Sequence, residues 1–351
     1  MNEAAIAIPA IVGKQGDRTF YQLMVKNKTL TSFFAVNLEP ESEKSQRALD
    51  PSHAAKITKY IVSNPQDYVL GTMTFAVDSE CRFEASNIAD NIGLLHIPLD
   101  STVRSLDGQH RRHALKDAIN QLESVSTDNS AMLLYVEPDV HKRRQMFSDM
   151  NSTPKVVSKA VNVRFNSRDP YSRAANRIID EHPLLEGIVE TERASVTAKS
   201  DKVWTLGGIF DGLKRLHPEY TKSSAKMAGA EENIFNRAQV LFDILGSARL
   251  ELAEASHGTL DLQVTRTENI LFSSVTLRAI AGALGEIYKV NGGVLSDDQI
   301  EDITDRLSEV DFSPSNPAWS DCGFLAPGTS TPSSRLQEIK AGTSVLVKLL
   351  S

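Results

Sequence analysis

The residues best suited to chemistry form a short run in the first half of the chain, Asp107-Gly108-Gln109-His110-Arg111. The preceding residues 102–106 have the composition of a β-strand, and the apolar residues that follow the run recur at helical spacing. A glycine turn between a strand and a helix offers backbone N–H groups at the positive end of the helix dipole, where an anion is favoured. The sequence therefore predicts an anion site, suited to a phosphate group, at this turn.

Arg111 lies on the same helical stripe as the apolar residues Leu115 and Leu122. An arginine on an inward face needs a counter-charge, because an unpaired buried charge is costly. A bound phosphate would supply that charge. Asp107, or another carboxylate of the chain, would also supply it and make Arg111 a structural brace. The sequence leaves both alternatives open.

The composition is that of a globular protein, with 41% hydrophobic and 24% charged residues in a chain of 351. This length suffices for one large domain or two ordinary ones. We find no apolar run long enough to span a bilayer and no basic N-terminal region of a secretory signal, so we expect a cytoplasmic protein with no membrane partner. Cys81 and Cys322 lie far apart and outside any CxxC motif, which disfavours a zinc site, an iron–sulfur cluster or a disulfide framework.

Charge is distributed unevenly along the chain. The formal net charge of −7 argues against a protein that coats DNA through uniform positive charge. Between His141 and Arg177, however, nine Lys or Arg stand against two Asp, which gives this stretch a charge of +7. A DNA-binding surface and an ordinary solvated surface are both compatible with such a stretch. The arginines assigned to DNA are Arg143, Arg144, Arg164, Arg168, Arg173 and Arg177.

Strands and helices alternate around the central turn. Asp50 is expected to be the N-cap of a helix that has Pro51 in its first position. In chain order we predict a hairpin of strands at 7–12 and 19–25, a helix at 50–62, strands at 68–78, 102–106 and 131–136, and a polar helix at 139–150. These elements predict an α/β domain over residues 1–157.

From residue 158 onward the chain is almost wholly helical in pattern. Ser158 and Asp169 are N-cap signals. Phe312 and Trp319 are expected to anchor the C-terminal tail on a helical core, and residues 345–350 fit either a strand or a helix. Further helices are expected at 204–216, 232–254, 275–288 and 296–308, with loops at 221–230 and 258–266. The second domain is therefore a mainly helical one with a C-terminal tail, residues 158–351.

The DGQHR run at residues 107–111 resembles the signature of the DndB, or DGQHR-domain, family found in bacterial DNA-modification gene clusters. That family is similar to the ParB/sulfiredoxin superfamily, where a comparable Gly-x-x-Arg turn opens a helix and holds nucleotide phosphates. Segments near residue 47, at 147–151 and at 310–319 resemble the family as well. The resemblance implies an α/β ParB-like N-terminal domain followed by a mainly α-helical C-terminal domain, with a cleft between them lined by the DGQHR run and the basic helices.

The resemblance also implies site residues. Asp149 and Asn151 would lie near the mouth of the DGQHR pocket and orient a metal-bound water. The competing interpretation, a helix-surface Asp and a C-cap Asn, is slightly preferred. The residues implied to contact the nucleotide are Gly108, Gln109, Arg111, Arg47 and Asn151.

The function implied is that of a DndB-like accessory or regulatory protein of a phosphorothioation-type DNA-modification system. Such a protein would bind DNA and bind ATP or another nucleoside triphosphate with Mg²⁺ at the DGQHR site. Whether it hydrolyses the nucleotide is left open. Hydrolysis needs a metal ligand and a base near the γ-phosphate, for which Asp107, His110 and Asp149 are available, with Asp107 as the Mg²⁺ ligand.

Three alternatives remain for the function. One is a non-catalytic transcriptional repressor of the modification cluster, although we find no helix-turn-helix signature for base-specific reading. Another is the related accessory ATPase of a 7-deazaguanine DNA-modification system. The third is an adaptor that holds other proteins of the cluster together. A homo-oligomer is compatible with all of them.

Overall fold

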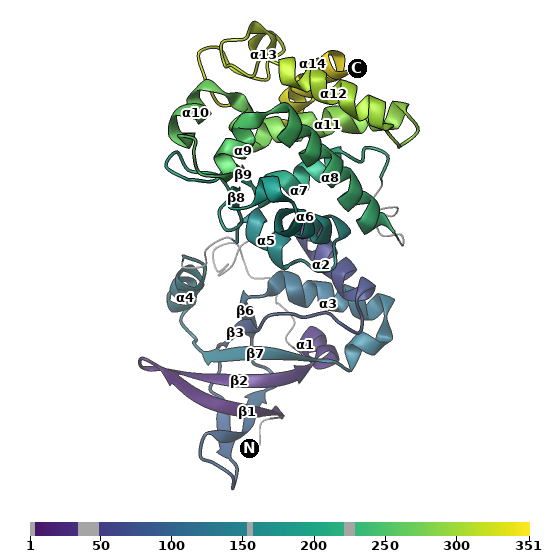
Figure 1. Ribbon diagram of the computed structural model, residues 1–351. Coiled ribbons are helices and arrows are strands. Elements are labelled where there is room, and N and C mark those ends of the chain that lie inside the picture. Colours follow the sequence, from purple (N-terminus) through teal and green to yellow (C-terminus); the bar gives the residue numbers. More distant parts are fainter. Residues whose placement is uncertain (1–3, 34–48, 153–156, 221–228) are drawn as a thin grey trace. The chain divides into compact units, whose positions relative to one another are not determined.

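The computed structural model in Figure 1 describes residues 4–33, 49–152, 157–220 and 229–351. The chain divides into two compact units, Met1–Lys155 and Val156–Ser351. The first unit carries a seven-stranded sheet, and the second is built almost entirely of helices. The predicted α/β fold with helical parts is therefore confirmed, whereas the likeness to ParB stays a prediction. None of the helices in the described ranges is long and apolar enough to cross a membrane.

The sheet of the first unit is mostly antiparallel. Its spatial order is β4-β5-β1-β2-β7-β3-β6, and β3 with β7 is the parallel pair among these neighbours. The strands are β1 (Ala5–Gln15), β2 (Arg18–Lys26), β3 (Met73–Val77), β4 (Arg82–Ala85), β5 (Ile92–Pro98), β6 (Val103–Asp107) and β7 (Asn129–Val136). The predicted hairpin is confirmed as β1 and β2. The sequence did not predict β4 and β5.

Alternation along the strands gives the sheet two covered faces. Phe75 and Leu134 point into one core, and their neighbours Ala76 and Tyr135 point into the other. The first face is covered by α1 (Asn27–Ser32), α2 (Pro51–Ser63) and α3 (Gln109–Gln121), followed by a 3₁₀ turn, Glu123–Ser126. The second face is covered by α4 (Val140–Ser152), which packs Met146 against it. The helices α3 and α4 therefore lie on opposite faces of one sheet.

The predicted strand at 68–78 forms only in its second half, as β3. The carbonyl oxygens of Gly71 and Thr72 accept hydrogen bonds from Arg111, and the Tyr68 hydroxyl donates to Asp128 at 2.7 Å. The segment before β3 therefore makes its hydrogen bonds with side chains and not with a neighbouring strand of the sheet. As a result, residues 68–72 connect α2 to β3 and lie against the start of α3.

The second unit is organised around α11 (Ser274–Val290), which is buried along most of its length and packs against α7 (Leu206–Arg215) and α14 (Leu336–Leu350). Its other helices are α5 (Lys159–Phe165), α6 (Pro170–Glu181), α8 (Ala230–Ala248), α9 (Leu250–Ser256), α10 (Leu262–Glu268), α12 (Asp297–Glu309) and α13 (Pro317–Asp321). Short elements complete the unit: β8 (Val189–Glu190), β9 (Trp204–Thr205) and the 3₁₀ turns Pro183–Leu185 and Ile270–Phe272.

Two expectations for the helical unit were wrong. The predicted helix at 232–254 is two helices, α8 and α9, separated at Arg249, whose backbone is not helical (φ −134°, ψ 83°). Its guanidinium donates to the carbonyl oxygens of Ser308 and Val310, so a distant contact fixes the break. The predicted loop at 258–266 contains α10, because the Asp261 carboxylate caps the first turn of that helix.

Other expectations for this unit are confirmed. Ser158 and Asp169 cap α5 and α6 with their side chains. Phe312 and Trp319 are fully buried and stack with ring centroids 5.6 Å apart, so they do anchor the tail on the helical core. The last residues of the chain, left open by the sequence, belong to the helix α14.

Candidate functional site

The DGQHR run forms the expected strand–glycine–helix turn. Asp107 is the last residue of β6, Gly108 is the N-cap of α3, and Gln109 is the first helical residue. Gly108 has φ +94°, in the left-handed region that favours glycine. A Cβ at this position would also lie 2.4 Å from Cγ of Met73. Glycine is thus required here both by its backbone angle and by the close approach of β3.

Arg111 is held by three contacts within the first unit. Its Nη1 donates to the carbonyl oxygens of Gly71 at 2.8 Å and Thr72 at 3.1 Å, and its Nη2 donates to Oδ2 of Asp107 at 2.6 Å. The side chain is only 22% exposed. The contact with Asp107 is the one expected of a structural brace, with Asp107 as the counter-charge. Phosphate binding by Arg111 stays a prediction. Arg111 ties the turn, the start of α3 and the segment before β3 together.

The start of α3 lies against the start of α2. Nε2 of His110 accepts a hydrogen bond from the backbone N–H of Asp50 at 2.9 Å, and the rings of His53 and His110 meet edge to face at 5.0 Å. About two turns further along α2 and one turn further along α3, the Thr58 hydroxyl donates to the carbonyl oxygen of Ala114 at 3.4 Å. Because both contacts advance in the same direction along the two helices, α2 and α3 run parallel with their N-termini together.

This pairing brings the N-termini of α2 and α3 to one point of the first unit, where the Asp50 carboxylate caps α2. The dipoles of α2 and α3 reinforce each other there, and two imidazoles stand beside the helix ends. The Asp50 carboxylate already responds to this environment, since the backbone N–H of His53 and then that of Ser52 lower its pKa below the usual value. Gly108 has no side chain with which to cap α3. The arrangement suits an anion. No pattern in the sequence indicated the part played by His53, because it is distant from the DGQHR run along the chain.

The structure places the second predicted motif on the other face of the sheet. Asp149 and Asn151 lie in the last turns of α4, and both are exposed. Asp149 accepts from the Gln145 side chain at 2.6 Å, and Asn151 donates to the carbonyl oxygen of Phe147 at 2.8 Å. Asn151 is therefore a residue of the helix and not its C-cap. Arg47 lies outside the described residues.

The six predicted DNA-binding arginines have different surroundings. In the first unit Arg143 is buried and donates to the carbonyl oxygens of Glu137 and Pro138, so it stabilises the chain just before α4. Its neighbour Arg144 is half-buried. In the second unit Arg168 is exposed at the connection between α5 and α6.

The other three arginines are paired with acids of the second unit. Arg164 contacts Asp180 at 3.1 Å, and Arg173 contacts Glu231 at 2.5 Å. Arg177 bridges Glu181 at 3.0 Å and Glu232 at 2.7 Å. Much of the local excess of +7 along the sequence is therefore neutralised in space by carboxylates outside the stretch that was counted.

The described residues contain no group of three or more His, Cys, Asp or Glu arranged to hold a metal ion. Asp107 is the carboxylate of the DGQHR turn, and Arg111 already holds it. Mg²⁺ is often bound by one or two carboxylates together with substrate phosphates. Asp107 alone, already paired with Arg111, provides too few ligands to hold Mg²⁺ without other groups. It is better suited to a Mg²⁺ ion that binds together with a nucleotide.

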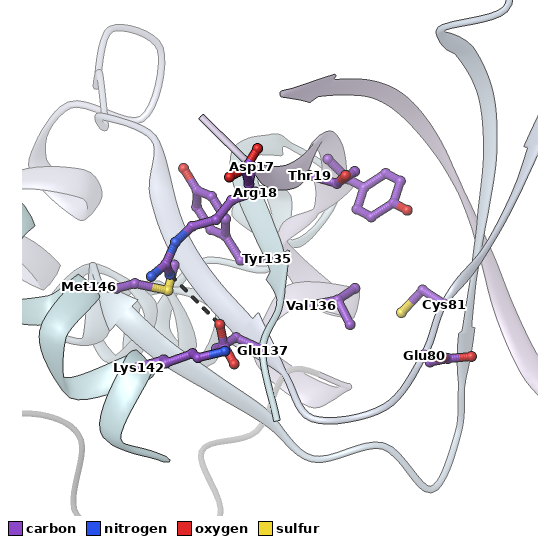
Figure 2. A pocket seen from close by; sticks show the side chains of 11 residues that line it. Asp17, Arg18, Thr19, Glu80, Cys81, Tyr135, Val136, Glu137, Lys142 and Met146 are labelled. Carbon is purple, nitrogen blue, oxygen red and sulfur yellow. Dashed lines mark ion pairs between the residues drawn. The ribbon is translucent and has the colours of Figure 1, made fainter. Parts of the chain in front are cut away.

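A separate cavity of about 560 Å³ lies in the first unit, between the β1–β2 turn, the end of β7 and the start of α4. Figure 2 shows the ion pair between Arg18 and Glu137, 3.8 Å apart, on its wall. Cys81 also lines it, but burial raises the pKa of that thiol to about 11. The thiol is therefore protonated near neutral pH and is a poor nucleophile. Among the residues that the structure describes, none of those predicted for catalysis or nucleotide binding lines this cavity.

The fold and the turn define an α/β protein in which a strand–glycine–helix motif brings two helix N-termini together, followed in the chain by a helical unit. A family model described as DndB, DNA-sulfur modification-associated, matches residues 8–348. The chain belongs to the DndB family, and the resemblance seen in its DGQHR run is confirmed. No curated protein and no solved structure matches the chain.

Proposed function

We propose that this protein serves a DNA-sulfur modification system as an accessory or regulatory protein that binds DNA and binds a nucleoside triphosphate at the DGQHR turn. The association with DNA-sulfur modification comes from its family. That description favours a phosphorothioation-type system over the 7-deazaguanine alternative. DNA, nucleotide and other proteins of the same system are the proposed partners.

The observation that carries the nucleotide proposal is the parallel pairing of α2 and α3. Two helix N-termini and the side chains of His53 and His110 meet at one point, and this combination favours a phosphate. Gly108 and Gln109 would contribute backbone N–H groups at the start of α3. In this proposal Arg111 is a positioning residue, because its three hydrogen bonds hold the turn in the shape that presents those groups.

Hydrolysis is the more demanding part of the proposal. His110 would have to act as a base, yet its Nε2 accepts the N–H of Asp50, and Asp107 would have to meet Mg²⁺ while paired with Arg111. The geometry thus favours nucleotide binding over rapid turnover. A repressor that binds DNA without nucleotide chemistry is the second candidate, and the engagement of Arg111 by protein groups is the observation in its favour.

Titration calorimetry of the full chain with ATP and Mg²⁺ tests the proposal, with phosphate release measured in the same samples. Replacing both His53 and His110 by alanine should weaken ATP binding tenfold or more, since each charge-assisted hydrogen bond contributes about 1.5–3 kcal/mol. His113→Ala is the matched control: it removes an imidazole from the next turn of α3, where His113 pairs with Asp117. The control should bind ATP like the wild type.

DNA binding is measured in parallel by fluorescence anisotropy with a labelled duplex, with and without ATP. A DNA affinity that changes on adding ATP supports a nucleotide-responsive accessory protein. Wild-type protein that binds duplex DNA but takes up no ATP would contradict the nucleotide proposal and leave the repressor. Equal loss of ATP binding in the His113→Ala control would show that ATP does not bind at the N-termini of α2 and α3.

A further inference from the structure

The helical unit contains a cavity of its own, about 510 Å³ in volume. This volume is within the range of small-molecule sites, about 300–1,000 Å³. Its wall is formed by the first turns of α7 and α11, by the segment 193–196 and by the segment 330–334. All of these residues belong to the second unit, so the cavity is independent of the DGQHR turn.

Two helix starts are held together on one side of this cavity. The backbone N–H of Thr205 donates to Oγ of Ser274 at 2.9 Å, and Oγ1 of Thr205 accepts the N–H of Gly208 at 3.0 Å. A Cβ on Gly208 would lie 2.5 Å from Cβ of Ser274, so only glycine permits this approach. The positive ends of α7 and α11 therefore face the same space.

The charges on the wall are strongly unequal. Among the described residues, the cavity is lined by four cationic ones, Lys159, Arg193, Arg266 and Arg278, and by one carboxylate, that of Asp211. Lys159 contacts Oδ1 of Asp211 at 2.5 Å and takes most of that negative charge. Arg266 is used structurally, because it donates to the carbonyl oxygens of Ala198, Ser200 and Lys202.

Of the two remaining cations, Arg193 is exposed to solvent, whereas Arg278 is largely buried and lacks adequate compensation. Its side chain is 20% exposed, and its Nε lies 4.0 Å from Oδ2 of Asp211, beyond hydrogen-bonding distance. This Nε is buried and has no hydrogen-bond partner. A buried unsatisfied donor on a charged group is unfavourable. A second guanidinium is close enough to be affected, since burial and then the charge of Arg278 lower the pKa of Arg215.

We propose that this cavity binds a small phosphate-bearing anion, of the size of a mononucleotide, with Arg278 as its principal ligand. An arginine fork, two helix N-termini and the hydroxyls of Ser274 and Thr331 are the groups that hold phosphate oxygens. The apolar side chains of Val203 and Phe272 on the same wall offer a surface for a nucleoside. The site goes beyond the proposed function, because it lies in the other unit and needs none of the DGQHR residues.

Calorimetry of the full chain with inorganic phosphate and with AMP tests this site. Wild type should bind AMP in the millimolar range or tighter, and Arg278→Gln should weaken that binding tenfold or more. Asp211→Asn should act in the opposite direction and strengthen it, because the competing carboxylate is removed. Tighter binding of AMP than of inorganic phosphate identifies a contribution of the nucleoside, and equal binding identifies phosphate as the ligand.

Two controls separate this site from others. Arg306→Gln removes an exposed arginine of the same unit, paired with Asp302 at 2.9 Å, and should bind AMP as the wild type does. The variant lacking the imidazoles of His53 and His110 should also retain this AMP site, whatever it does to ATP. Absence of binding in wild type, or unchanged AMP affinity in folded Arg278→Gln and Asp211→Asn proteins, would overturn the proposal.

Discussion

Nη2 of Arg111 lies 2.6 Å from Oδ2 of Asp107, and the other terminal nitrogen of the same guanidinium reaches the carbonyl oxygens of Gly71 and Thr72. The motif that suggests a phosphate ligand in the sequence is thus a junction of three chain segments. A planar guanidinium carries its donors on separate nitrogens and can reach three acceptors at once. A lysine ammonium carries its donors on a single nitrogen and presents them in a different geometry.

Arg111→Ala should lower the free energy of unfolding of the first unit by about 1–3 kcal/mol, because the turn loses three hydrogen bonds from a charged donor. Both tryptophans, Trp204 and Trp319, lie in the second unit, so their fluorescence does not report on this loss. Hydrogen exchange of the α3 amides is the suitable measurement. Unchanged exchange together with complete loss of ATP binding would make Arg111 a phosphate ligand instead.

Gly108→Ala should be more damaging, with a loss above about 2 kcal/mol, because it combines left-handed backbone strain with overlap of Met73. Gly16→Ala is the matched control. Gly16 also has a positive φ, +57°, but no atom lies within 4 Å of its added Cβ. A Gly108→Ala protein no less stable than Gly16→Ala would show that β3 yields easily at this point. Urea unfolding followed by circular dichroism measures both.

Local patterns in the sequence were sufficient for much of the fold. The Asp50 and Asp169 caps, the β1–β2 hairpin and the turn at Gly108 each depend on a few neighbouring residues with defined backbone preferences. The strands β4 and β5 were missed because their stability comes from pairing with each other and with β1, far away along the chain.

The candidate site was predictable only in part for the same reason. The run 107–111 predicts an anion-favouring turn from neighbouring residues alone. The contact of His110 with the start of α2 could not be predicted in this way, because it joins residues sixty positions apart. The basic stretch was misleading as a measure of surface charge. Glu231 and Glu232, which pair with Arg173 and Arg177, lie more than fifty residues further along the chain. A count of charges along a window cannot include them.

The pairing of Arg164 with Asp180 allows a two-way test of DNA contact. If Arg164 binds phosphates, Asp180→Asn should strengthen DNA binding by freeing the guanidinium, and Arg164→Gln should weaken it for all sequences. The slope of log affinity against log salt should fall by about one unit in Arg164→Gln. Anisotropy titrations at several salt concentrations measure both effects.

The pair Arg306–Asp302 provides the control for that experiment. It has nearly the same exposure, 43% and 58% against 39% and 55%, and is also a surface pair of the second unit. Asp302→Asn and Arg306→Gln should leave DNA binding unchanged. If both pairs change DNA affinity alike, the effect comes from net charge, and if neither does, α5 and α6 lie outside the DNA surface. Arg168→Glu, at the exposed connection between these helices, extends the same test.

His217 should make the helical unit sensitive to acid. It is 1% exposed, one ring nitrogen contacts the carbonyl oxygen of Leu213 at 2.9 Å, and burial lowers the pKa of the imidazole below 6.5. Below pH 6.5 the unfolded chain takes up a proton that the folded unit resists. The contribution of His217 to the free energy of unfolding should therefore be constant above pH 6.5. Below pH 6.5 it should fall as the pH drops, by at most about 1.4 kcal/mol per pH unit.

Replacing His217 by glutamine removes the titrating group and retains a donor for the Leu213 carbonyl oxygen. The variant should lose some stability at pH 7.5, because glutamine replaces a well-packed ring that contacts the rings of Tyr171 and Tyr220. Its stability should nevertheless change less between pH 7 and pH 5 than that of the wild type. Urea unfolding monitored by tryptophan fluorescence reports the helical unit alone, since Trp204 and Trp319 both lie in its core. Parallel pH profiles for wild type and His217→Gln would assign the acid sensitivity to other groups.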